Sequence, residues 1–161
     1  MKTINIFSER TSIKQVEEGD ELAPKFNSKG LIPIVTTDAE SGELLMHGFM
    51  NQKALELSIE TGEMHYYSRS RQKIWLKGET SGFKQTIHEL LIDDDQDAVW
   101  AKVTATGGAS CHVGYRSCFY RRINLDRNIN SDQKAKLQFT ETKKVFEPTE
   151  VYPEESNPTK L

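Results

Sequence analysis

Four aspartates stand within five positions of the stretch LIDDDQDAVW, residues 91–100, and their carboxylates could bind a metal ion. Asp93, Asp94, Asp95 and Asp97 lie between apolar residues on both sides. If the stretch continues as an extended strand, side chains alternate between its faces, and Asp94 points away from the other three. Three carboxylates on one face repel one another, and a hard cation such as Mg²⁺ removes that repulsion. A solvated acidic turn is the alternative, because aspartate is common in turns.

Two cysteines and a histidine occupy a glycine- and serine-rich stretch, GGASCHVGYRSC, which reads as a loop. Cys111 and Cys118 are seven positions apart, and His112 follows the first cysteine. Thiolate and imidazole suit Zn²⁺, and a catalytic zinc needs a third protein ligand beside a water. The spacing differs from that of a zinc finger, whose paired cysteines are separated by about two to four residues. Two ordinary buried thiols are therefore the alternative interpretation.

A run of serines and arginines within HYYSRSRQKIWLKGETSG, residues 65–82, offers groups that bind phosphate. Arg69 and Arg71 carry guanidinium groups that match phosphate bidentately, and Ser68 and Ser70 add hydroxyls. A second polar cluster follows, bracketed by two glycines, and comprises Lys77, Glu79, Thr80 and Ser81. The aromatic residues of the segment are His65, Tyr66, Tyr67 and Trp75. The aromatic rings could stack on a base or pack in the core, and a solvated basic strand is the alternative for the whole segment.

The elements that must position these side chains are mostly strands. Strand composition is found at residues 31–38, 43–50, 63–70, 73–78, 84–93 and 98–106. One core helix is predicted over residues 51–62, with Asn51 as its N-cap, Gly62 at its C-terminal end, and Leu55 and Ile59 on a shared face. A short helix is predicted within residues 12–22, capped by Ser12 or Thr11. The fold class is therefore α+β and dominated by strands.

Length and composition limit the classes of protein. The chain has 161 residues, which suits one domain, and 28% of them are charged, so part of its apolar surface could be buried against another subunit. The net charge of −3 argues against general binding of nucleic acid. The sequence lacks an apolar run long enough to span a membrane and lacks a secretory signal at its start. We expect a cytoplasmic protein, in which the two cysteines stay reduced.

The chain is expected to form a single domain over residues 1–123, followed by a polar segment. Residues 1–25 are an N-terminal extension, and residues 124–161 read as a loop, a stretch with some strand character at 137–152, and a frayed tail.

Taken together, the separate motifs resemble one enzyme family. The segments LIP, HYYSRSRQKIWLKGETSG, DDDQD and GGASCHVGYRSCFYRR occur in the order and spacing of the phosphoribosyl-AMP cyclohydrolase family, and the similarity covers residues 26–122. The resemblance implies hydrolysis of the N1–C6 bond of the adenine ring in N1-(5-phosphoribosyl)-AMP, which yields the formimino-carboxamide ribonucleotide ProFAR in histidine biosynthesis. It also implies a β-rich, intertwined homodimer.

The resemblance further implies two metal sites. Cys111 and Cys118 would be zinc ligands at the dimer interface, with ligands drawn from both subunits. Asp93, Asp95 and Asp97 would bind Mg²⁺, and the serine–arginine run would hold the phosphates of the substrate.

The sequence departs from the family pattern at Asp94, where the family commonly has a third zinc-binding cysteine. Aspartate is a competent zinc ligand, so we expect Asp94 to complete a site of two cysteines and one aspartate across the dimer. Carboxylate is harder than thiolate, so Mn²⁺ or Fe²⁺ should compete better with zinc.

The chemistry of the substrate suggests roles for the histidines. Alkylation at N1 makes C6 of the purine electrophilic, and zinc would supply hydroxide near neutral pH. His112 is the first candidate for proton transfer and His65 the second, although His112 could be a further ligand and His65 a packed strand residue. His47 and His88 are expected to be structural.

Two other functions stay open. The chain could be a paralogue that opens another purine or pyrimidine ring, or a metal-binding dimer without catalysis. The residues after Ile123 are too few and too polar for the pyrophosphate-removing domain fused to many relatives, so we expect one function.

Overall fold

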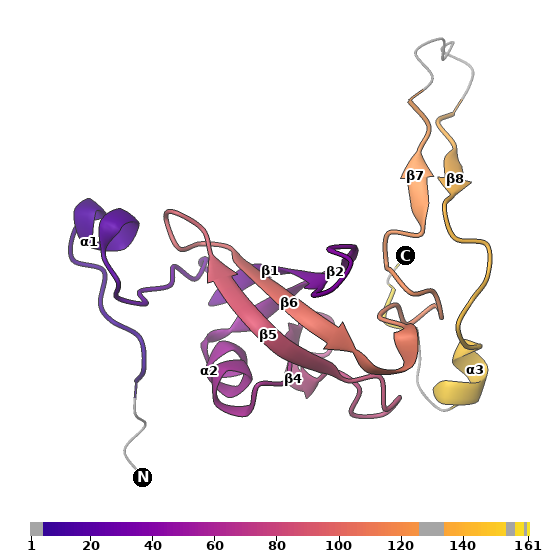
Figure 1. The fold of residues 1–161 in the computed structure, drawn as a ribbon, viewed down its shortest axis with the longest axis horizontal. Coiled ribbons are helices and arrows are strands. Elements are labelled where there is room, and N and C mark those ends of the chain that lie inside the picture. Colours follow the sequence, from indigo (N-terminus) through magenta and orange to yellow (C-terminus); the bar gives the residue numbers. More distant parts are fainter. Residues whose placement is uncertain (1–4, 126–133, 154–156, 160) are drawn as a thin grey trace.

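A four-stranded sheet forms the centre of the protein, in the order β2-β1-β6-β5 (Figure 1). The computed structural model describes residues 5–125, 134–153, 157–159 and 161. The strands are β1 (Leu31–Asp38), β2 (Leu44–Asn51), β5 (Gln85–Ile92) and β6 (Val99–Ala105). β1 pairs antiparallel with β2 and parallel with β6, and β5 pairs antiparallel with β6. The α+β class dominated by strands is confirmed.

The helix α2 (Gln52–Thr61) follows β2 directly and begins and ends where the sequence predicts. Asn51 Oδ1 accepts a hydrogen bond from the backbone N–H of Ala54 at 2.9 Å, and Gly62 ends the helix in the left-handed region, with φ 71°. The predicted apolar face was partly wrong, because Leu55 is buried whereas Ile59 is 43% exposed. The helix turns Ala54, Leu55 and Ser58 to the core instead.

A separate hairpin of β3 (His65–Ser68) and β4 (Lys73–Leu76) packs beside the sheet. Tyr66 on β3 stacks on Trp75 of β4, with ring centroids 5.2 Å apart. The serine–arginine run therefore occupies the turn of this hairpin, at the edge of the core.

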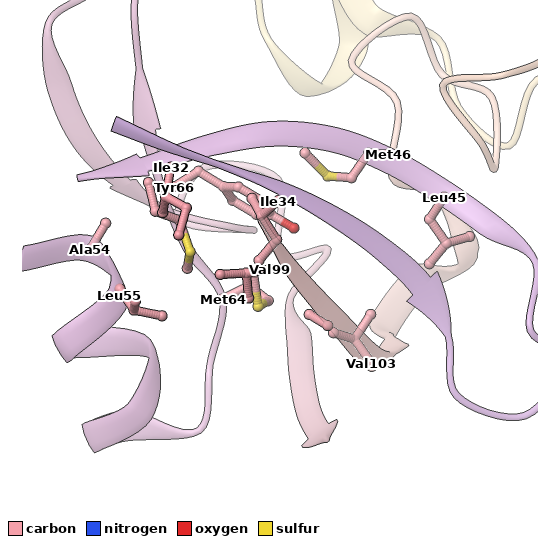
Figure 2. Packing of buried hydrophobic residues seen from close by; sticks show 12 residues of the cluster. Ile32, Ile34, Leu45, Met46, Ala54, Leu55, Met64, Tyr66, Val99 and Val103 are labelled. Atoms are coloured by element: carbon pink, nitrogen blue, oxygen red, sulfur yellow. The ribbon is translucent and has the colours of Figure 1, made fainter. Parts of the chain in front are cut away.

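The hydrophobic core lies between the four-stranded sheet and α2, as Figure 2 shows. The buried side chains that Figure 2 labels are Ile32, Ile34, Leu45, Met46, Ala54, Leu55, Met64, Tyr66, Val99 and Val103. They come from β1, β2, α2, β3 and β6 and the turn before β3. The hairpin and the sheet therefore share one hydrophobic core.

Tyr66 carries the largest fully buried side chain, and its hydroxyl is the centre of a polar network inside the core. The hydroxyl donates to Gln85 Oε1 at 2.6 Å and accepts from Thr36 Oγ1 at 2.7 Å. Gln85 Nε2 in turn donates to Ser110 Oγ at 3.2 Å. Burial raises the pKa of the Tyr66 hydroxyl, so this group stays a donor at all physiological pH values.

We expect Tyr66→Phe to lower the free energy of unfolding by about 1–3 kcal/mol, because the buried Gln85 Oε1 loses its donor. Urea denaturation measures the change, and Tyr67→Phe on the same strand is the control because Tyr67 is only half-buried. Equal effects of the two substitutions would show that the Tyr66 network contributes nothing specific.

The two ends of the chain pack at opposite sides of the sheet (Figure 1). The helix α1 (Ile13–Glu18) is capped by Ser12, whose Oγ accepts from the Gln15 N–H at 3.1 Å, so Ser12 rather than Thr11 is the cap. β7 (Arg121–Ile123) and β8 (Leu137–Phe139) form an antiparallel ribbon that stands out from the body. Part of the loop predicted after residue 123 lies outside the described residues.

The strand character predicted for residues 137–152 is right only for β8. The rest of that stretch is irregular or helical, and α3 (Pro148–Val151) begins with a proline, whose fixed φ suits the first turn of a helix. None of the described helices is long and apolar enough to cross a membrane.

Candidate active site

A cavity of about 810 Å³ opens beside the β3–β4 hairpin. Its walls are the hairpin turn, the turn after β4, the cysteine loop and the segment around α3. All of the residues predicted to bind substrate line it, namely Ser68, Arg69, Ser70, Arg71, Trp75, Lys77, Glu79, Thr80 and Ser81. The fold thus brings the two polar clusters of this segment to one surface.

Three cationic side chains of the cavity lie near aromatic rings. The guanidinium carbon of Arg69 lies 4.2 Å from the centroid of Phe49, and that of Arg71 lies 5.9 Å from the centroid of Trp75. Lys77 Nζ lies 5.4 Å from the same Trp75 centroid. Cation–π contacts orient a cation without neutralising it. The cavity therefore presents positive charge that suits an anionic ligand.

The cysteine loop follows β6 after a single helical turn, η1 (Thr106–Gly108), and docks on β2. The backbone N–H of Cys118 donates to the Leu45 carbonyl at 2.7 Å, and Ser117 Oγ donates to the Leu44 carbonyl at 2.7 Å. The N–H of Gly114 donates to the Cys111 carbonyl at 3.0 Å, which folds the loop back on itself. This folding brings the two thiols together.

The two thiols interact directly. A hydrogen bond from the Cys118 thiol lowers the pKa of Cys111 to about 6, and the positive charge of Lys77 contributes to the same shift. The pKa of the Cys118 thiol is raised, first by this hydrogen bond and then by burial. The shift favours the thiolate form of Cys111, and thiolate is the form that binds metal.

Lys77 and His112 complete the polar end of the cavity. Lys77 is buried and its Nζ donates to the Ser110 carbonyl at 2.6 Å; burial lowers the pKa of its ammonium group. Burial also lowers the pKa of His112, and its Nε2 is buried without a hydrogen-bond partner among the described residues. A neutral imidazole with an unpaired ring nitrogen can accept a proton or bind a metal ion.

The donor set of the cysteine loop fits zinc but is incomplete within one chain. Two adjacent sulfurs and an imidazole with an unpaired nitrogen are groups that zinc binds. Within the part of the chain that the structure describes, however, the one group of three or more potential ligand atoms within 4.8 Å of one another is Asp93, Asp95 and Asp97. A third ligand for the two cysteines would have to come from a rearranged His112 or from another copy of the chain.

The aspartates form a turn rather than a strand, so the predicted extended conformation was wrong. β5 ends at Ile92, and Asp93 Oδ1 accepts from the N–H groups of Asp97 at 2.9 Å and Ala98 at 3.0 Å. A short carboxylate that accepts from nearby backbone groups stabilises a turn at the expense of a strand. Gln96 adopts φ 58°, which no strand residue does.

The turn nevertheless brings three of the carboxylates together. Ligand atoms of Asp93, Asp95 and Asp97 lie within 4.8 Å of one another. Desolvation, followed by the like charges of Asp95 and Asp93, raises the pKa of Asp97. Asp94 is exposed and is not part of this group. The arrangement of three oxygen donors fits Mg²⁺, which would remove their repulsion.

Asp94 lies far from the cysteine pair of the same chain. The aspartate turn precedes β6, and the cysteine loop follows it. The seven residues of β6 alone span about 20 Å, at roughly 3.3 Å per residue. Among the described residues, Asp94 does not form a group of ligand atoms within 4.8 Å of one another together with Cys111 and Cys118.

The other histidines occupy three different settings. His65 is not among the residues that line the cavity, and its Nδ1 lies 2.9 Å from the Glu63 carbonyl. His88 pairs with Thr104 Oγ1 at 2.7 Å, also away from the cavity. His47, expected to be structural, lines the cavity beside Phe49, with ring centroids 5.1 Å apart.

Sequence reasoning also missed a wall formed by the C-terminal segment. Thr149, Tyr152 and Asn157 line the cavity, and the side chain of Asn157 partly offsets the lowering of the pKa of His112. No local signal marks these residues, because their place depends on contacts with distant parts of the chain. Alternation along β2 could have indicated His47, since it shares a face with Phe49.

Comparison with known proteins agrees with the resemblance seen in the sequence. The family model for phosphoribosyl-AMP cyclohydrolase matches residues 46–120. A phosphoribosyl-AMP cyclohydrolase of Rhodopseudomonas palustris (strain TIE-1) is 53% identical over 137 residues, which are 85% of this chain and 88% of that protein. Its namesakes from Sinorhizobium fredii and Rhizobium leguminosarum bv. trifolii are each 48% identical, and the alignments cover 87% and 91% of this chain and 90% and 96% of the relatives. The chain belongs to the phosphoribosyl-AMP cyclohydrolase family.

Proposed function

We propose that this protein opens the adenine ring of N1-(5-phosphoribosyl)-AMP by hydrolysis of the N1–C6 bond and releases ProFAR in the biosynthesis of histidine. The observation that carries the proposal is that the serine–arginine run, Cys118 and His112 line one cavity. Groups that bind phosphate and groups that hold a metal ion or move a proton thus face the same space. The similarity to named cyclohydrolases over most of the chain supports the same reaction.

The cavity suits the size and charge of this substrate. Its volume of about 810 Å³ falls within the range of roughly 300–1,000 Å³ of small-molecule sites. The substrate carries two phosphate groups, and Arg69 and Arg71 can bind a phosphate bidentately. Trp75 is stacked on Tyr66 and also lines the cavity, where its ring adds aromatic surface against which a purine can pack. In this arrangement the phosphates anchor the nucleotide and the aromatic wall orients its base.

Two metal ions complete the proposed site. Cys111 and Cys118 would hold zinc, with Asp94 of a second copy as the third protein ligand, and Asp93, Asp95 and Asp97 would hold Mg²⁺ close to phosphate. Zinc bound there would supply hydroxide near neutral pH, because it lowers the pKa of water to about 7. Mg²⁺ would neutralise phosphate charge.

The protein's own groups then act on the substrate. Alkylation at N1 leaves the purine cationic and its C6 open to attack by hydroxide. His112 Nε2, which is neutral and has no hydrogen-bond partner among the described residues, accepts a proton from the attacking oxygen and returns it to N1 as the C6–N1 bond breaks. His65 stays the second candidate, although its position outside the cavity favours a structural role.

The proposed enzyme is a cytoplasmic homodimer. In one chain Asp94 precedes β6 and the cysteines follow it, and a second copy would bring Asp94 to the cysteine pair. The sheet face opposite the core also carries exposed apolar residues: Val35 and Trp100 are paired across β1 and β6 and are 38% and 41% exposed. Burial of this face would stabilise the dimer.

The variant Asp94→Ala tests the proposed zinc ligand. We expect zinc content and turnover to fall together, and Asp94→Cys, which provides a thiolate, to bind zinc more selectively over Mn²⁺ than the natural protein. Asp20→Ala is the control, because Asp20 is an exposed aspartate of the N-terminal segment. Unchanged zinc content and rate in Asp94→Ala would contradict this role.

Rescue of a histidine auxotroph separates the proposal from the two other functions. A strain that lacks its own phosphoribosyl-AMP cyclohydrolase should grow without histidine when it expresses this chain. A paralogue specific for another ring, or a metal-binding dimer without catalysis, would not restore growth. Double replacement of Arg69 and Arg71 by alanine should abolish rescue, because the enzyme needs these arginines to bind the phosphates of its substrate. A storage protein would not need them.

A further inference from the structure

The side chain of Gln96 joins the aspartate turn to the N-terminal segment through three hydrogen bonds. This residue stands between Asp95 and Asp97 and is only 5% exposed. Its Oε1 accepts from the Ala23 N–H at 2.8 Å. Its Nε2 donates to the carbonyls of Val16 at 3.0 Å and Glu21 at 3.2 Å. The hydrogen-bonding groups of this amide are thus paired with the backbone of the extension.

Two further contacts join the same elements. The backbone carbonyl of Gln96 accepts from the Lys25 N–H at 2.7 Å. Arg10 donates to the Asp95 carbonyl at 2.9 Å and to the Ala23 carbonyl at 2.7 Å. The turn that carries the carboxylates is therefore fixed from outside, by residues 10–25, as well as by the internal hydrogen bonds of Asp93.

The backbone of Gln96 adopts a conformation that glutamine does not favour by itself. Its φ of 58° lies in the left-handed region, which glutamine seldom adopts and glycine adopts readily. Such a conformation persists when surrounding contacts over-determine it. The hydrogen bonds of the Gln96 side chain supply those contacts, and the conformation sets the directions in which Asp95 and Asp97 leave the turn.

We propose that Gln96, held by residues 10–25, is a positioning residue that keeps the carboxylates of Asp93, Asp95 and Asp97 converged for a divalent cation. The inference rests on the proposed cation site and assigns the N-terminal extension a part in it. Gln96 does not touch the cation. It acts through the backbone of its two neighbours, in the way that outer residues orient metal ligands elsewhere.

The decisive variant is Gln96→Gly. Glycine adopts the left-handed conformation more easily than glutamine, so the backbone of the turn keeps access to its present shape. Only the side-chain hydrogen bonds of Gln96 to Val16, Glu21 and Ala23 are lost. If the turn alone set the geometry, cation affinity would stay the same or improve. If Gln96 positions the carboxylates, the dissociation constant for Mn²⁺ rises by about tenfold or more, as for other outer-shell partners of metal ligands.

The matched control is Gln72→Gly. Gln72 is the other non-glycine residue with positive φ among the described residues, at 50°, and it is exposed in the turn between β3 and β4. This substitution makes the same chemical change in the same backbone conformation, away from residues 10–25. It should leave Mn²⁺ affinity unchanged.

Mn²⁺ binding to the full chain, followed by electron paramagnetic resonance with zinc saturating the cysteines, gives the readout independently of turnover. Gln96→Asn, whose shorter amide tolerates the same φ but does not reach Val16 and Glu21, should also bind weakly and serves if the glycine variant does not fold. Wild-type affinity in a folded Gln96→Gly or Gln96→Asn protein would overturn the inference and leave the proposed reaction untouched. Mn²⁺ binding by the natural protein without ring opening would instead contradict the proposed function alone. Absence of Mn²⁺ binding by the natural protein would overturn both the cation site and the role of Gln96.

Discussion

Cys118→Ala is expected to lose stoichiometric zinc and to reduce kcat by roughly a thousandfold or more, because the hydroxide supplied near neutral pH is lost with the metal. Cys118 is one of only two cysteines and lines the cavity, and its thiol hydrogen-bonds to Cys111. Its loss also removes the group that lowers the pKa of Cys111. The remaining thiol should therefore ionise at higher pH and bind zinc more weakly.

Zinc content by elemental analysis and turnover by absorbance change check this expectation in parallel. Circular dichroism serves as the folding control, since the backbone N–H of residue 118 can still donate to the Leu45 carbonyl. Cys111→Ala should behave in the same way. Full zinc content in either variant would show that the cysteine pair is not the zinc site.

His112→Ala is expected to lower kcat by about 10²–10⁴-fold, the usual contribution of a positioned acid–base group, with little change in KM. The physical reason is that its buried, unpaired Nε2 is held neutral at the pH where it has to accept a proton. Zinc content should stay unchanged, which distinguishes proton transfer from a role as a further ligand. Loss of zinc together with activity would identify His112 as a ligand.

His88→Ala provides the matched control for this variant. His88 pairs with Thr104 on the sheet, away from the cavity, and its removal should leave kcat within about twofold of the natural protein. Near wild-type turnover by His112→Ala would exclude it as the proton-transfer residue and leave His65 and the cavity-lining His47 to be tested.

The regular elements of the fold were predictable because their signals are local. Strand composition located β1 to β6 to within a few residues, and Asn51 and Gly62 marked the two ends of α2. The exposure of Ile59 was not predictable from helical periodicity alone, because the position of the core relative to α2 depends on how the β3–β4 hairpin packs. The pairing of β1 with β6 is likewise a long-range feature that composition does not encode.

The aspartate turn shows where local reasoning failed and why. Alternation along an extended strand predicted that Asp94 faces away from its neighbours. Asp94 does stand apart from the three clustered carboxylates. The extended conformation from which this was predicted, however, is wrong. The turn depends on Asp93 accepting two backbone N–H groups and on Gln96 being held by the N-terminal extension. Ala23, which donates to the Gln96 side chain, is more than seventy residues away from Gln96 in sequence, so local reasoning could not identify it.

The cavity was predictable on one side only. The residues of the serine–arginine run and the glycine-bracketed cluster are close in sequence, and their chemistry marks them as a site. Another part of the wall is built by Tyr152, from the stretch predicted to have strand character, and by Asn157, from the tail predicted to fray. The segment is fixed by non-local contacts, among them a hydrogen bond from the Val145 N–H to the Gly114 carbonyl at 2.7 Å.

The central claim is that this chain opens the adenine ring of N1-(5-phosphoribosyl)-AMP with help from metal ions at two separate sites. The most direct test is an ultraviolet assay of ring opening with metal-free protein, to which Zn²⁺, Mn²⁺ and Mg²⁺ are added back separately and in pairs. The account predicts no turnover without metal, recovery with zinc or Mn²⁺, and further enhancement when Mg²⁺ is added. Full turnover by metal-free protein, or no ring opening under any combination of metals, would contradict it.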